Sequence, residues 1–151
     1  MKTIILGLGN PVLRDDSIGI SVAHALEKGI VQPDVDIVTA SVAGLDILDL
    51  LAGYEQAIIV DAIQTGEGKA GRVYRLDPET LKTVCQNNPH DMDFVTALEL
   101  GNKLGMDLPQ KVTIFAVEAG DTNPFSEKCT PQVEAAIPRC VKMITRELSG
   151  E

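Results

Sequence analysis

The stretch Ile4–Gly19, which reads IILGLGNPVLRDDSIG, constrains the fold more than any other part of the chain. Its apolar start is typical of a buried parallel strand, and the glycines that follow are typical of a tight turn. Apolar residues at helical spacing begin at Ile18 and continue to Gly29, which predicts a helix. Ligands of parallel α/β sheets bind beyond the carboxyl ends of the strands, so the turn is a candidate functional site.

Two kinds of binding turn are compatible with this stretch. Gly7 and Gly9 match the first two glycines of a dinucleotide-binding fingerprint, but Val12 stands where the third glycine is required. The adjacent carboxylates Asp15 and Asp16 would repel a phosphate and suit a cation instead. Taken alone, these acids are most simply explained as residues that cap the following helix and interact with its dipole.

Composition limits the classes of function. The chain has 151 residues, 44% of them hydrophobic, and we expect residues 1–151 to form a single domain. A net charge of −9 argues against nucleic acid and anionic membranes as partners, because both bind through Lys and Arg. Three cysteines without a C-x-x-C motif, and an initial apolar run too short for a signal peptide, indicate a cytoplasmic protein.

The remaining pattern alternates strands and helices without hairpins. The order predicts a three-layer α/β/α sandwich with a twisted, mostly parallel sheet of about five strands. Thr130 and Pro131 are expected to cap and open the last helix, and Pro138 is expected to kink it. Besides the first strand, we expect strands at Asp34–Thr39, Ala57–Ala62, Arg72–Leu76 and Lys111–Val117.

Two further residues join Asp16 as candidates for chemistry. Asp61 interrupts an apolar strand at its carboxyl end, where a buried carboxylate is costly unless it is paired or binds a metal. His90 follows the break at Gln86–Pro89 and lies just before or inside the first turn of a helix. Two carboxylates and an imidazole are plausible ligands of a divalent transition metal, whereas a capping Asp61 and a solvent-exposed His90 are the simpler alternatives.

These motifs together resemble one family. The sequence Gly9-Asn-Pro-Val-Leu-Arg-Asp-Asp-Ser-Ile-Gly19, then Asp61-Ala62, His90-Asp91-Met92 and Thr130-Pro131, is similar in order and spacing to the [NiFe]-hydrogenase maturation endopeptidases. The resemblance runs nearly from end to end. Its first motif is specific, whereas the second and third are short.

The resemblance implies a cytoplasmic, monomeric endopeptidase that removes a C-terminal extension from the precursor of a hydrogenase large subunit after nickel insertion. It implies that Asp16, Asp61 and His90 contact the nickel and form the catalytic site. The precursor supplies the nickel, although other divalent metals are expected to occupy the site in the isolated protein. Either metal-bound water or a carboxylate base is compatible with this site.

The chain departs from the family pattern at two positions. Thr39 stands where many members carry an aspartate after the second strand, and Ser17 replaces a common glycine or alanine.

The alternative function is a non-enzymatic metal- or nucleotide-binding module of flavodoxin-like shape, based on Gly7 and Gly9. A metal-dependent hydrolase of small peptides is a third hypothesis.

Overall fold

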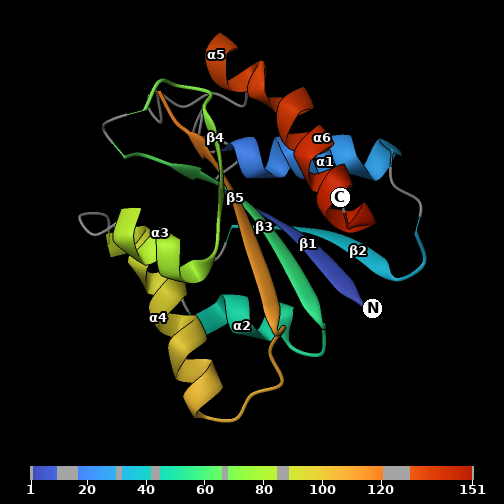
Figure 1. The fold of residues 1–151 in the computed structure, drawn as a ribbon, viewed down its shortest axis with the longest axis vertical. Coiled ribbons are helices and arrows are strands. Elements are labelled where there is room, and N and C mark those ends of the chain that lie inside the picture. Colours follow the sequence, from blue (N-terminus) through green and yellow to red (C-terminus); the bar gives the residue numbers. More distant parts are fainter. Residues whose placement is uncertain are drawn as a thin grey trace.

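A computed structural model describes residues 2–9, 17–29, 32–41, 45–65, 68–84, 89–120 and 130–150, but not the side chains of 45, 84 and 89–93. Within these residues the chain forms one sheet with the strand order β2-β1-β3-β5-β4 (Figure 1). All neighbouring strands are parallel except β4 and β5. The strands are β1 (Thr3–Leu8), β2 (Val35–Ala40), β3 (Gln56–Ile63), β4 (Val73–Leu76) and β5 (Lys111–Glu118).

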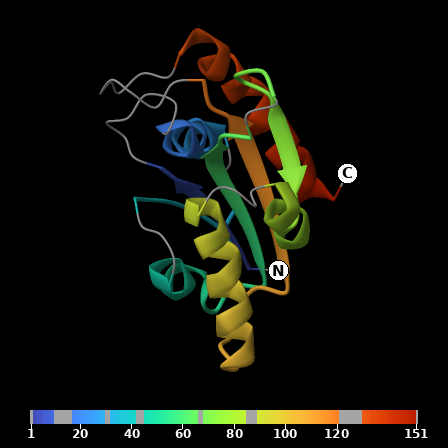
Figure 2. The same ribbon diagram turned by 90° about the vertical axis from the view of Figure 1, so that its left-hand side faces the viewer.

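Helices cover both faces of this sheet. Apolar side chains of α1 (Ile18–Gly29), α5 (Pro131–Glu134) and α6 (Ala136–Ser149) pack on one face. Those of α2 (Leu45–Leu51), α3 (Pro78–Val84) and α4 (Pro89–Lys103) pack on the other, and Figures 1 and 2 show both layers. The predicted three-layer α/β/α sandwich with a mostly parallel five-stranded sheet is therefore confirmed.

The central strands form because their residues are apolar on both faces. In β1 every residue is buried, and in β3 only Asp61 and Ala62 are partly exposed. Alternate side chains of a strand point to opposite faces, so each of these strands contributes to both cores. This arrangement explains why the two strands read as continuous apolar runs rather than as alternating patterns.

Helix α1 begins unusually close to the sheet. A Cβ atom added to Gly19 would lie 2.2 Å from the carbonyl oxygen of Leu8 and 2.3 Å from that of Val60. A Cβ added to Gly7 would lie 2.3 Å from the carbonyl oxygen of Gly19. Only glycine allows this approach, and it places the start of α1 against the carboxyl ends of β1 and β3.

Three local predictions require correction. The strand expected at Arg72–Leu76 begins at Val73 and pairs antiparallel with β5 at the sheet edge. The last helix is not a single kinked helix, because it divides into α5 and α6 at Ala135; Pro138 has no N–H to bond to the carbonyl of Glu134. Thr130 precedes the first-turn Pro131 as expected, but its side chain makes no capping hydrogen bond.

None of the helices described here combines the length and apolar character that crossing a membrane requires.

Candidate functional site

The connectivity of the sheet creates a topological switch point between β1 and β3. From β1 the chain passes through α1 to β2 on one side, and through α2 it then returns to β3 on the other side of β1. Helices α1 and α2 lie on opposite faces, so they diverge where the strand order reverses. In open α/β sheets this switch point, at the carboxyl ends of the strands, is where ligands bind.

Asp61 lies at this switch point. It is the sixth of the eight residues of β3, and its side chain is partly buried. Ile59 and Ile63 pack under α2, α3 and α4. Asp61 lies midway between them, two residues from each, so its side chain points to the same face of the sheet. The backbone N–H of Ala62 donates a 2.8 Å hydrogen bond to Asp61 Oδ1, which orients the carboxylate.

Of the other two candidates, the structure describes only the backbone of His90. Asp16 lies outside the described residues; Ser17, which follows it in the sequence, is buried at the start of α1. His90 is the second residue of α4, but its side chain is also outside the description. Helix α4 runs from the carboxyl side of the sheet toward the start of β5, so its first residues lie on the face that carries Asp61 (Figure 1).

A buried carboxylate just beyond the strand expected at Lys111–Val117 is the last residue of β5, which ends at Glu118. Glu118 is 3% exposed, and its carboxylate accepts hydrogen bonds from the Thr65 backbone N–H at 2.8 Å and the Thr65 hydroxyl at 2.5 Å. The Tyr74 hydroxyl donates a third at 3.0 Å. Glu118 ends an apolar strand, as Asp61 nearly does. This shared pattern could have identified Glu118 as a candidate from the sequence.

Burial raises the pKa of Tyr74, and the hydrogen bond to Glu118 raises it further. Tyr74 is therefore protonated at neutral pH and acts as the donor to the Glu118 carboxylate. Glu118 lies opposite Ile63 in the β3–β5 register, two residues beyond the pairing of Asp61 with Ala116. Both acids consequently face the same side of the sheet at its carboxyl edge.

The described cysteine does not contribute a nucleophile. Cys140 lies on the buried face of α6, and burial raises the pKa of its thiol to about 12. Thiolate is the reactive form, so this residue is inert at neutral pH. Cys85 and Cys129 lie outside the described residues.

Among the described side chains, no group of three or more His, Cys, Asp and Glu residues is arranged to hold a metal ion. The side chains of Asp16 and His90 lie outside the described set.

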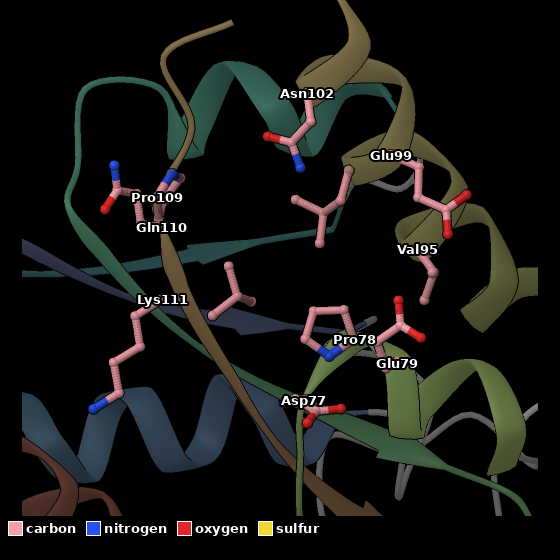
Figure 3. A pocket seen from close by; sticks show the side chains of 11 residues that line it. Asp77, Pro78, Glu79, Val95, Glu99, Asn102, Pro109, Gln110 and Lys111 are labelled. Atoms are coloured by element: carbon pink, nitrogen blue, oxygen red, sulfur yellow. The ribbon is translucent and has the colours of Figure 1, made fainter.

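A cavity of about 380 Å³ lies elsewhere, between α3, α4 and the start of β5 (Figure 3). Val95, Pro78 and Pro109 contribute apolar surface, and Glu79 and Glu99 lie at its rim. Lys111, the first residue of β5, also lines it, which places the cavity near the amino edge of that strand. Neither Asp61 nor Glu118 lines this cavity, so it lies apart from the switch point.

Comparison with known proteins gives a consistent result. The family model described as hydrogenase maturation protease matches residues 20–147. The chain is 30% identical to the hydrogenase 2 maturation protease of Escherichia coli strain K12, over 98% of this chain and 91% of that protein.

Solved structures agree in fold. The hydrogenase maturating endopeptidase HybD from E. coli superposes with a TM-score of 0.86 at 29% identity, covering 99% of this chain and 94% of that one. The [NiFe] hydrogenase maturation protease HycI from Thermococcus kodakarensis KOD1 gives 0.74 at 25% identity, covering 98% and 92%. From the family match and these similarities over nearly the full length, we conclude that the chain belongs to the hydrogenase maturation protease family.

Proposed function

We propose that this protein is a cytoplasmic, monomeric endopeptidase that removes the C-terminal extension of a [NiFe]-hydrogenase large-subunit precursor after nickel insertion. The observation that carries the proposal is the place of Asp61, a carboxylate at the switch point of a hydrogenase maturation protease fold. Nickel belongs to the precursor in this proposal and serves as the feature by which the enzyme recognises a precursor that is ready for cleavage.

Asp16, Asp61 and His90 are the residues we propose to contact the nickel and to form the catalytic site. Two carboxylates and one imidazole suit a divalent transition metal but leave its coordination incomplete. Such a set binds free nickel weakly, so the enzyme would act only on a precursor that supplies the remaining ligands. The hydrogen bond from Ala62 N–H to Asp61 Oδ1 supports this role because it holds the carboxylate in one orientation.

The same geometry weakens the case for a nucleotide-binding module. That hypothesis was based on Gly7 and Gly9, the glycines of an incomplete fingerprint. Gly7 has a packing role instead, because its Cα faces the carbonyl oxygen of Gly19 in α1. The glycine at this position is therefore required by the close contact of strand and helix, whether or not a phosphate binds.

The test is incubation of the purified protein with large-subunit precursors from the same cell, loaded with nickel or nickel-free, followed by mass spectrometry of the precursor C-terminus. We expect loss of one defined peptide from the loaded precursor only. Equal cleavage of the nickel-free form would contradict nickel recognition. Turnover of short generic peptides would favour a general metal-dependent peptidase instead.

Replacements at the three residues test the site. Asp16→Asn, Asp61→Asn and His90→Ala are each expected to lower the processing rate about 100-fold or more, the scale of losing a positioned catalytic group. Asp49→Asn and His24→Ala change exposed side chains of α2 and α1 and serve as matched controls. Normal processing by the Asp61 and His90 variants would refute the assigned site.

A further inference from the structure

Four residues gather around the carboxyl end of β5, and we call them the Glu118 clamp: Glu118 of β5, Tyr74 of β4, and Thr65 and Gly68 from the chain after β3. The Glu118 carboxylate accepts from the Thr65 N–H, the Thr65 hydroxyl and the Tyr74 hydroxyl. The Gly68 N–H donates to the Thr65 hydroxyl oxygen at 3.3 Å. A Cβ on Gly68 would lie 2.1 Å from the Tyr74 hydroxyl and 2.6 Å from Glu118 Oε1, so the Gly68 backbone closes over the carboxylate.

An ionised carboxylate matches the three donors of the clamp. Every group that contacts it through these three bonds is a donor, and an ionised carboxylate offers acceptors only. A glutamine would turn one of the two acceptor oxygens into a donor, so the two hydroxyl bonds would have to reverse their direction or the bond from the Thr65 N–H would be lost. A buried acid satisfied by several donors holds their chain segments in one arrangement.

The segment held in this way begins at Ile63, two residues after Asp61. The chain leaving β3 is bonded first at Ile63, whose carbonyl accepts the Ala119 N–H at 2.8 Å, and next at Thr65 through the clamp. On the other side, Gly71 N–H donates to the Glu118 carbonyl and Glu118 N–H to the Arg72 carbonyl, each at 2.8 Å. The end of β5 therefore holds both ends of the connection between β3 and β4.

We propose that Glu118 is a positioning residue for Asp61: acting through Thr65, it fixes the course of the chain beyond β3 and thereby the orientation of the Asp61 carboxylate. The proposal rests on the proposed function, which makes Asp61 a residue of the active site. Thr65 lies four residues after Asp61, and Tyr74 lies on β4, so the two hydroxyls separate an effect on β3 from an effect on β4.

The experiment compares Thr65→Val and Tyr74→Phe. Each removes one hydroxyl donor to Glu118 Oε1, but only Thr65→Val loosens the chain that follows Asp61. We expect Thr65→Val to lower kcat for the nickel-loaded precursor at least tenfold with KM changed less than threefold, and Tyr74→Phe to change both less than threefold. Thr65→Ser, which keeps the hydroxyl, should restore the wild-type rate.

An independent readout is the backbone amide of Ala62, which donates to Asp61 Oδ1. Its proton chemical shift and exchange rate should change in Thr65→Val and Glu118→Gln but not in Tyr74→Phe. Equal effects of Thr65→Val and Tyr74→Phe on kcat and on the Ala62 amide would overturn the proposal. If the wild type processes no precursor, the proposed function fails, while the Ala62 amide still tests the clamp.

Discussion

The contact of α1 with the sheet leads to a prediction that can be worked from distances. In Gly19→Ala the new methyl group would lie 2.2 Å and 2.3 Å from the carbonyl oxygens of Leu8 and Val60. Both obstacles are backbone atoms of central strands, so neither can turn aside as a flexible side chain would. The start of α1 must move by roughly 1 Å to restore ordinary van der Waals separations.

Two opposing effects set the magnitude. Overpacking of this kind costs about 1–3 kcal/mol, and the upper end applies because two strands resist the shift. Replacing glycine by alanine also restricts the unfolded chain, which stabilises the fold by about 0.4–1 kcal/mol. The clash is the larger effect, so we expect the free energy of unfolding to fall by about 2 kcal/mol and Tm by about 4–8 °C.

The assay is chemical denaturation followed by circular dichroism, with Gly29→Ala as the matched control. Gly29 ends the same helix, is exposed, and has no atom within 4 Å of an added Cβ. We expect Gly29→Ala to be unchanged or more stable by up to about 1 kcal/mol. If Gly19→Ala were as stable as Gly29→Ala, close packing would not be the reason for a glycine at position 19.

Three further predictions concern the cores and the surface. Burial raises the pKa of Cys140 to about 12, so the stability that its neutral thiol contributes is complete below about pH 9 and is lost as pH rises toward 12. In alkaline denaturation we expect the free energy of unfolding of Cys140→Ala to fall less steeply than that of the wild type, by about 1.4 kcal/mol per pH unit. Ile144→Ala empties a fully buried site and should cost about 2–5 kcal/mol in urea unfolding, whereas Leu104→Ala, at a residue 70% exposed, should change it by less than about 0.5 kcal/mol. Lys82→Met removes an ion pair with Glu99 whose partners are about half exposed, and a change above about 1 kcal/mol in the same unfolding measurement would contradict the expectation that such pairs contribute little.

The sequence alone determined the alternation of strands and helices, and with it the fold class. Apolar runs such as Ile4–Leu8 and the helical spacing after Ile18 are local patterns. They indicate which residues are buried, because the burial of apolar side chains drives the formation of these strands and helices. The carboxylate that ends an apolar run at Asp61 was readable for the same reason: an acid in that position is costly and therefore informative.

What the tertiary structure decided are the relations between distant residues. The strand order, the antiparallel β4, the face toward which Asp61 points and the three donors around Glu118 all depend on which strands pair and in which register. Shifting the register by one residue would move Glu118 to the opposite face, and no local pattern specifies that choice. Glu118 is 53 residues from Thr65 and 44 from Tyr74 in the chain, and only the folded sheet brings their polar groups together near the end of the strand that carries Asp61.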